Sequence, residues 1–265
     1  MTHTSTKQFE YQGIPVAYHK IGNGPPLLIL HGWGSSSRVM LQTAKSLSDI
    51  RTCYIPDLPG FGTTPPPQKA WSIGDYSGFA RAFAREVIGG STDMLAHSFG
   101  GRITLKWAAE NGSELRKIII TGGAGMKPKR NFSYHWRRIL ATLLKAPFVL
   151  LPMALKTKAL NWLRTTAIWK TLGSSDYQQL DGVMRETLVK SVSEHLEHCL
   201  PHISHEVLLL WGKDDEATPW YQAERMEKGL KNGALVGIDR AGHYSFLDQP
   251  DRFQRIARAF LVHEN

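Results

Sequence analysis

The chain of 265 residues contains only two cysteines, Cys53 and Cys199. So few thiols cannot form a disulfide framework or a cysteine-rich zinc site, and their scarcity fits a reducing compartment. No apolar run reaches the ~20 residues that a membrane-spanning helix needs. The longest, residues 139–155, contains Lys145 and two prolines, and the polar first ten residues lack the apolar core of a signal peptide. We therefore expect a soluble, cytoplasmic protein.

Acidic residues are missing between Leu115 and Ser175, a stretch that we call the acid-free segment. Its twelve basic residues are Arg116, Lys117, Lys127, Lys129, Arg130, Arg137, Arg138, Lys145, Lys156, Lys158, Arg164 and Lys170. The formal net charge of the chain is +9, yet the rest of the chain holds 20 basic against 23 acidic side chains. The positive charge therefore belongs to this segment, and an anionic partner would be attracted there.

Short apolar runs without alternation recur along the chain, and turn residues bound each of them. Such runs are typical of strands buried on both faces, as in a parallel sheet. They occupy residues 26–30, 52–55, 93–96, 117–120, 207–211 and 235–238. Amphipathic stretches of helical length lie between most of them, at residues 36–47, 73–87, 99–110, 220–230 and 251–261. With a hairpin of residues 9–12 and 14–18 in front, this order predicts a mostly parallel α/β sheet flanked by helices.

One interval, residues 122–201, contains no convincing strand and shows helical periodicity interrupted at Pro147, Pro152 and Gly173. An interval of this length between two sheet strands is too long for a loop. We therefore predict a helical subdomain at residues 122–201, inserted into a core domain of residues 1–121 and 202–265. Most of the acid-free segment lies in this insertion.

A serine stands between an apolar run and an amphipathic stretch in the sequence Ala96-His97-Ser98-Phe99-Gly100. Small residues two positions before and after Ser98 allow a tight strand-to-helix turn, which predicts a positive φ at the serine. The turn would hold the hydroxyl at a helix N-terminus, where amide groups stabilise a developing anion. Ser98 is thus a candidate nucleophile, and an ordinary N-capping serine is the alternative.

Polar residues also follow three other apolar runs. The first run ends in His31-Gly32-Trp33-Gly34, so the amides of Trp33 and Phe99 can form an oxyanion hole, although a glycine-rich turn with a structural His31 is the alternative. The fifth is followed by Asp214 and Asp215, and the last by His243. Because ligands bind at the carboxyl edge of such sheets, Ser98, His243 and one of these aspartates can converge.

With these motifs the sequence resembles the α/β-hydrolase superfamily over essentially its whole length. The resemblance rests on residues 31–34, the loop of residues 57–62 (DLPGFG), the elbow at Ser98, residues 212–215 and residues 242–243. It implies the α/β-hydrolase fold with an inserted helical cap, no cofactor, and a triad in which the spacing Gly-x-x-Asp favours Asp215 over Asp214. The sequence departs from the family at Ala96, where glycine is more usual.

Serine at the elbow excludes the branches that resemble haloalkane dehalogenases and epoxide hydrolases, which use aspartate there. We expect a serine hydrolase that cleaves a carboxylic ester or related acyl compound, with His243 as base and Asp215 as its orienting partner. A carbon–carbon bond hydrolase or lyase with the same triad is the alternative, and a non-catalytic ligand-binding protein is a third possibility.

Several other residues have ordinary structural roles as alternatives to functional ones. Aromatic and methionine side chains are more often core than ligand contacts, but the resemblance implies a substrate pocket at Trp33, Met126, Trp136 and Trp162. His31 and His97 are expected to be structural, and Cys53 inert. Four histidines are spaced by three, four and three residues: His195, His198, His202 and His205. Pro201 interrupts them, so a solvated surface is expected rather than a metal site.

The acid-free segment indicates which substrates or surfaces the protein could attract. Its basic residues alternate with leucines and aromatics, a pattern that suits an amphipathic lid at a lipid surface, while a solvated exterior is the plain alternative. Our hypothesis is that the cap attracts amphiphilic or anionic acyl substrates. Nucleic acid is not expected, because no recognition motif is present.

Overall fold

The computed structural model describes residues 5–110, 112–129, 155 and 182–263. The chain divides into two compact units, one of Met1–Lys127 with Glu186–Asn265 and one of Pro128–Arg185. The second unit contains fewer residues than the insertion predicted at residues 122–201. Residues 122–127 and 186–201, at the two ends of that interval, belong to the first unit. Trp136 and Trp162 lie outside the described residues, so a lid over the site stays a prediction.

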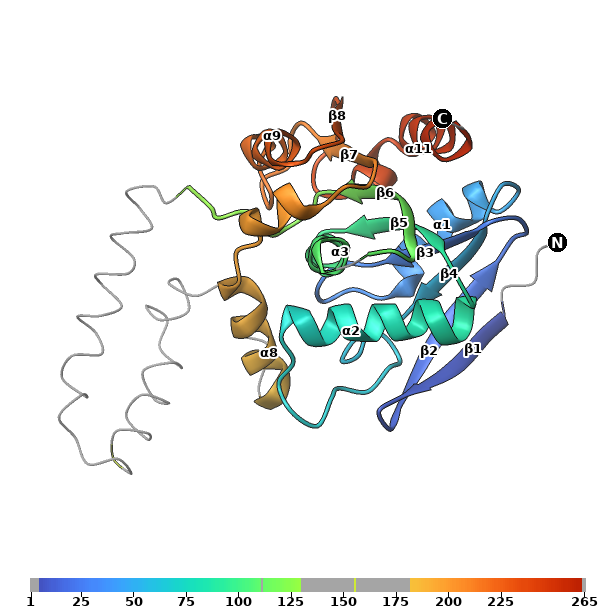
Figure 1. Ribbon diagram of the computed structural model, residues 1–265, viewed down its shortest axis with the longest axis vertical. Coiled ribbons are helices and arrows are strands. Elements are labelled where there is room, and N and C mark those ends of the chain that lie inside the picture. The colour runs from blue at the N-terminus through green and yellow to red at the C-terminus, as the bar shows by residue number, and fades with distance from the viewer. Residues whose placement is uncertain (1–4, 111, 130–154, 156–181, 264–265) are drawn as a thin grey trace. The chain divides into compact units, whose positions relative to one another are not determined.

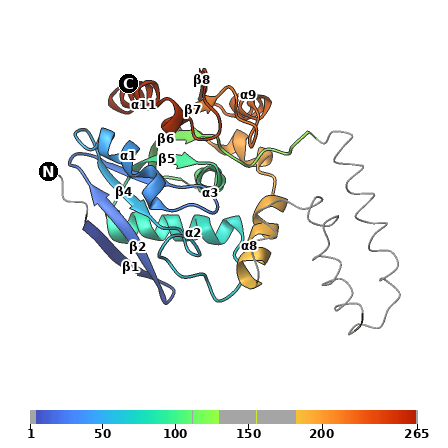
Figure 2. The same ribbon diagram turned by 180° about the vertical axis from the view of Figure 1, so that it is seen from behind.

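An eight-stranded sheet forms the centre of the first unit, in the order β1-β2-β4-β3-β5-β6-β7-β8 (Figures 1 and 2). The strands are β1 (Ser5–Tyr11), β2 (Ile14–Ile21), β3 (Pro26–Leu30), β4 (Thr52–Pro56), β5 (Thr92–His97), β6 (Leu115–Thr121), β7 (Val207–Gly212) and β8 (Gly233–Ile238). β2 pairs antiparallel with β1 and β4, and every later neighbouring pair is parallel. The predicted mostly parallel sheet with an opening hairpin is confirmed.

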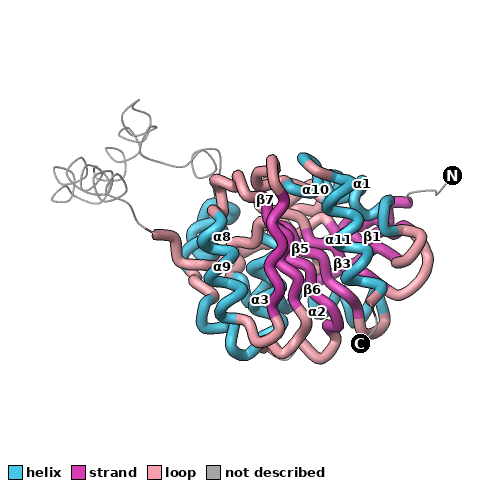
Figure 3. Tube along the Cα trace, turned by 90° about the horizontal axis from the view of Figure 1, so that it is seen from above, coloured by secondary structure: helices cyan, strands magenta, loops and turns pink. Residues whose placement is uncertain are grey.

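Helices cover both faces of this sheet. The α-helices formed by the described residues are α1 (Ser37–Leu47), α2 (Ile73–Phe83), α3 (Phe99–Ala109), α8 (Gly182–Ser193), α9 (Trp220–Gly229), α10 (Ser245–Asp248) and α11 (Pro250–Val262). Figure 3 shows α1, α10 and α11 on one face and α3 and α9 on the other. The stretch predicted as one helix at residues 73–87 differs from the structure, because regular α-helix ends at Phe83 and a π-helical turn follows at Ala84–Ile88.

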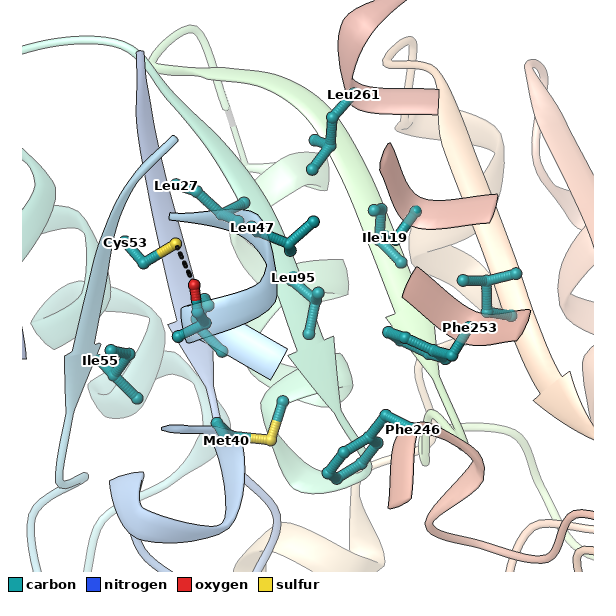
Figure 4. Packing of buried hydrophobic residues seen from close by; sticks show 14 of the residues in the cluster. Leu27, Met40, Leu47, Cys53, Ile55, Leu95, Ile119, Phe246, Phe253 and Leu261 are labelled. Atoms are coloured by element: carbon teal, nitrogen blue, oxygen red, sulfur yellow. Dashed lines mark hydrogen bonds between the residues drawn. The ribbon is translucent and has the colours of Figure 1, made fainter. Parts of the chain in front are cut away.

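The core explains why the strands read as unbroken apolar runs. Leu27 and Ile29 of β3 point toward α1 and α11, whereas Leu28 and Leu30 point to the opposite face. The helices add residues at helical spacing: Met40, Ala44 and Leu47 from α1, and Phe253, Ala257 and Leu261 from α11 (Figure 4). Both faces of β3 are therefore buried, and alternation disappears from its sequence.

The thiol of Cys53 and the length of the helices bear on two further predictions from the sequence. Cys53 is buried in the core with its Sγ 3.5 Å from the carbonyl oxygen of Ala44, and burial raises the pKa of its thiol to about 12 (Figure 4). Such a thiol stays protonated and unreactive. Among the helices of the described ranges, none combines the length and apolar character that crossing a membrane requires.

Candidate active site

Ser98 occupies the single position between the end of β5 and the start of α3. Its φ is 50° and its ψ is −106°, so the predicted positive φ is present. The amide of Ser98 donates to the carbonyl oxygen of Thr121 at 3.1 Å, and its carbonyl accepts from the amides of Gly101 at 3.0 Å and Ala124 at 3.1 Å. A backbone of this kind costs roughly 1–3 kcal/mol, and these bonds hold it in place.

Small residues around Ser98 let three segments approach one another. A Cβ on Gly100 would lie 2.7 Å from the carbonyl oxygen of Leu30, and one on Gly32 would lie 3.2 Å from the Cβ of Ser98. Ala96 is fully buried between Leu30 of β3 and Ile120 of β6. The turn therefore forms with alanine at the position where the family more often has glycine.

The structure brings Ser98, His243 and Asp215 into one hydrogen-bonded chain. Ser98 Oγ lies 3.0 Å from His243 Nε2, and His243 Nδ1 lies 2.9 Å from Asp215 Oδ2. Asp215 follows β7 and His243 follows β8, so both sit beyond the carboxyl ends of their strands. In this arrangement Nδ1–H donates to the carboxylate, and Nε2 is left to accept the hydroxyl proton.

Asp215 is held on both carboxylate oxygens, and its side chain is 0% exposed. Oδ1 accepts from the amides of Ala217 at 2.9 Å and Thr218 at 2.8 Å, and Oδ2 accepts from Thr218 Oγ1 at 2.8 Å. Burial alone would raise the pKa of Asp215, but the hydrogen bonds from His243 and Thr218 bring it below its ordinary value. The neighbouring Asp214 is exposed. The carboxylate bonded to His243 is therefore that of Asp215.

The two amides predicted as oxyanion donors belong to Phe99, the residue after Ser98, and to Trp33, the residue after Gly32. Phe99 is the first residue of α3, so its amide has no acceptor within its own helix. Trp33 directly follows Gly32, the residue that packs against Ser98. The Trp33 ring packs on Phe61 at 4.8 Å and on Phe99 at 5.0 Å between centroids. These contacts form an aromatic wall beside the serine.

Asp57 anchors the loop that carries Phe61, a role that its sequence motif did not predict. Its Oδ1 accepts from the amide of Ser37 at 2.7 Å, and its Oδ2 accepts from the amide and the hydroxyl of Thr63 at 2.8 and 3.0 Å. Burial opposes ionisation of Asp57, but these hydrogen bonds hold its pKa below the ordinary value. His31 supports the same loop by accepting from the amide of Leu58 at 3.0 Å.

Thr218, which binds Asp215, is a second residue that was not predicted from the sequence, although a threonine three residues after an aspartate is a common turn pattern.

Two fully buried histidines lie near the site. His31 donates from Nδ1 to the carbonyl of Gly32 at 2.8 Å, and burial lowers its pKa to about 4. His97 donates from Nδ1 to the carbonyl of Thr121 at 3.1 Å, and burial, with the nearby His243, lowers its pKa to about 3. Both rings are neutral at neutral pH and are fixed by backbone groups.

The remaining candidate residues are Met126 and the four histidines within residues 195–205. Met126 is 2% exposed in the segment after β6, and its assignment to a pocket stays a prediction. His205 Nε2 donates to the carbonyl of Gly112 at 2.9 Å, and His198 Nε2 lies 3.5 Å from Cys199 Sγ. In the described part of the chain, no three His, Cys, Asp or Glu side chains are grouped to hold a metal ion.

The sequence profile of the alpha/beta hydrolase fold family matches residues 25–250. The chain belongs to this family. This alpha/beta hydrolase is 23% identical to the 2-hydroxy-6-oxo-2,4-heptadienoate hydrolase of Pseudomonas putida, with 96% of this chain and 95% of that protein covered. It is also 23% identical to the pimeloyl-[acyl-carrier protein] methyl ester esterase of Nitrosomonas europaea, with 88% and 94% covered.

Solved structures share the fold. One is a membrane phospholipase A described as a bacterial virulence factor, with a TM-score of 0.74, 24% identity, and 97% of this chain and 86% of that chain covered. Another is a meta-cleavage product hydrolase from Pseudomonas fluorescens IP01, with a TM-score of 0.71, 18% identity, and 96% and 97% covered. At these identities the likeness establishes the fold of this alpha/beta hydrolase and no substrate.

Proposed function

We propose that this alpha/beta hydrolase cleaves carboxylic esters or related acyl compounds with Ser98 as nucleophile, His243 as general base and Asp215 as the group that orients the imidazole. The observation that carries the proposal is the unbroken chain Ser98–His243–Asp215, with contacts of 3.0 and 2.9 Å. Relatives named as hydrolases and esterases support an enzyme.

The proposed reaction uses these groups in sequence. His243 Nε2 removes the proton from Ser98 Oγ as the oxygen attacks the acyl carbon, and the carbonyl oxygen becomes an oxyanion. The amides of Trp33 and Phe99 donate to that oxyanion, which places preformed dipoles where charge develops. His243 then gives its proton to the leaving alcohol, and an acyl-enzyme remains on Ser98.

Deacylation repeats the same steps with water. His243 Nε2 takes a proton from the water molecule that attacks the acyl carbon, and returns it to Ser98 Oγ as the acid departs. Asp215 stays ionised throughout, because its four hydrogen bonds favour the carboxylate. It keeps the imidazole in the tautomer that presents Nε2 to the serine and stabilises the imidazolium when it forms.

Carbon–carbon bond hydrolysis is the second candidate, and the relative from Pseudomonas putida favours it. The substrate in that relative's name has a ketone and no ester, so its hydrolysis breaks a bond to carbon. The same serine and histidine can serve both reactions. The two functions are separated by comparing a series of p-nitrophenyl esters with a vinylogous diketone acid.

The deciding experiment is labelling with a fluorophosphonate, followed by hydrolysis of the ester series. Wild-type protein should be labelled at Ser98, and Ser98→Ala should abolish labelling and lower kcat by about 10³ or more while the fold is retained. The matched control is Ser77→Ala, which removes the hydroxyl of a fully buried serine in α2. Full ester hydrolysis by Ser98→Ala would refute the assignment.

A further inference from the structure

Thr121, the last residue of β6, is bonded to both sides of the Ser98–His243 pair. Its carbonyl oxygen accepts from the amide of Ser98 at 3.1 Å and from Nδ1 of His97 at 3.1 Å. Its hydroxyl lies 2.9 Å from the hydroxyl of Ser245, two residues after His243. Thr121, His97 and Ser245 are each 0% exposed. One buried residue thus joins the backbone of the serine to the segment that carries the histidine.

The residue after Thr121 lies directly against the imidazole. Gly122 has a φ of +54°, and a Cβ on it would lie 2.9 Å from His243 Nδ1 and 3.0 Å from the His243 carbonyl oxygen. The backbone at Thr121 and Gly122 is therefore packed against His243 without spare room. A shift of this backbone would move the imidazole relative to Ser98 Oγ.

His97 adds a third link between Thr121 and the catalytic pair. Its ring centroid lies 4.7 Å from that of His243, with 54° between the ring planes. The orientation of the His97 ring is set by its bond to the Thr121 carbonyl. The surface on which the His243 ring rests is therefore fixed by the same carbonyl that holds the amide of Ser98.

We propose that Thr121 is a positioning residue, which keeps the Ser98 hydroxyl and the His243 imidazole at reacting distance through its carbonyl and its hydroxyl. This inference rests on the function proposed for Ser98 and His243. The physical reason is that Ser98 adopts a strained backbone and His243 lies on a loop after β8, so neither is fixed by regular secondary structure. Catalytic groups on such segments need buried hydrogen bonds from neighbouring elements to hold their geometry.

Thr121→Val tests the hydroxyl, because valine keeps the shape of threonine and leaves Ser245 Oγ without this partner. The loop carrying His243 then loses its bond to β6, and kcat should fall by about 10- to 100-fold. KM should change little, since neither hydroxyl is among the proposed substrate contacts. Thr121→Ser keeps a hydroxyl and should restore most of kcat.

Thr92→Val is the matched control. Thr92 is also 0% exposed, lies at the opposite end of β5, and bonds through its hydroxyl to the amide of Leu28 and the carbonyl of Asp93. The Thr92→Val substitution should lower the Tm without lowering kcat. Wild-type kcat in Thr121→Val, or an equal loss of kcat in Thr92→Val, would overturn the proposal.

A measurement that does not depend on activity completes the test. In 1H–13C spectra of the histidine rings, Thr121→Val should shift the signals of His243 and His97, and Thr92→Val should leave them in place. Unchanged His243 signals in Thr121→Val overturn the proposal even if Ser98 is labelled by the fluorophosphonate. Absence of labelling in the wild type refutes the proposed function instead, and the spectra still decide the role of Thr121. If Thr121→Val does not fold, Ser245→Ala removes the same bond from its other side.

Discussion

Asp215 is rigid because each of its carboxylate oxygens has two donors. Oδ1 binds the amides of Ala217 and Thr218, and Oδ2 binds His243 and the Thr218 hydroxyl. A carboxylate fixed in this way determines which imidazole nitrogen carries the proton. The same turn leaves Asp214 exposed, with its amide donating to the carbonyl of Ala241 at 3.0 Å.

We predict that Asp215→Asn lowers kcat by about 10⁴, because an amide can donate to Nδ1 and stabilise the wrong tautomer of His243. Asp214→Asn is the matched control and should stay close to wild type. Steady-state hydrolysis of the best ester measures both. The opposite ranking would move the role to Asp214.

Buried histidines make stability depend on pH. The pKa of His31 is lowered to about 4 and that of His97 to about 3, chiefly by burial. The ordinary pKa of a histidine is about 6.5. At pH values between that pKa and the lowered ones, the unfolded chain binds protons that the folded chain does not. The free energy of unfolding should therefore fall as pH drops below about 6.5, by about 2 kcal/mol per histidine at pH 5. Burial also lowers the pKa of His19, which acts in the same direction.

Urea denaturation between pH 7.5 and pH 5 measures this slope, and His97→Gln should reduce it. The pKa values of Asp57 and Asp215 lie below the ordinary 3.8, so the stability they add is present above that pH and lost only at more acidic pH. They cannot produce a slope in the chosen window. A wild-type stability that is constant from pH 7.5 to pH 5 would contradict the burial of these rings as neutral groups.

The tight packing of α3 on β3 makes the elbow possible. A Cβ on Gly100 would lie 2.7 Å from the carbonyl oxygen and 2.8 Å from the Cβ of Leu30. Backbone atoms of a central strand cannot move aside without disturbing the sheet. Gly100 is therefore required by close approach.

We predict that Gly100→Ala destabilises the protein by about 1–3 kcal/mol through this overlap, and lowers kcat because the elbow shifts. Gly78→Ala is the matched control, since Gly78 is also helical and a Cβ there would meet nothing nearer than Tyr11 Oη at 3.6 Å. It should stabilise the protein by about 0.5–1 kcal/mol. Thermal and urea unfolding compare the two variants, and equal effects would show that helix propensity alone decides both.

The charge of the protein is distributed unevenly along the chain. The net charge of +9 arises from the acid-free segment. We predict that the protein binds anionic lipid vesicles at low salt, and that binding weakens steeply as salt rises because exposed charges are screened beyond about 8–10 Å. Co-sedimentation with anionic vesicles at several salt concentrations measures this binding, and neutral vesicles serve as the control.

Two charge-reversed pairs test whether the segment is responsible. Lys156→Glu with Lys158→Glu should weaken vesicle binding, whereas Lys228→Glu with Lys231→Glu, at exposed positions in and beyond α9, should weaken it less. If the wild type shows no binding at low salt, and anionic and neutral esters share one salt dependence of hydrolysis, the basic residues form only a solvated surface.

The architecture and the order of the site residues along the chain could be predicted from local sequence patterns. The parallel strands lie within two residues of the apolar runs that predicted them. Ser98, Asp215 and His243 follow strands whose carboxyl ends share one edge, so their convergence could be expected from the sequence. These features can be predicted from local patterns, because neighbouring residues in the sequence indicate whether a strand is buried and whether a turn can be tight.

The contacts between segments that are distant in the sequence could not be predicted, because they depend on how the folded elements pack. The bond between Thr121 and Ser245 joins residues 124 positions apart, and the anchor from Asp57 to the amide of Ser37 depends on how β4 and α1 pack. The low pKa values of His31 and His97 arise from complete burial, which neighbouring residues do not reveal. Hydrogen bonds and desolvation depend on which groups the fold brings within a few ångströms of each other. The sequence around a common residue such as threonine does not predict which group it will bind.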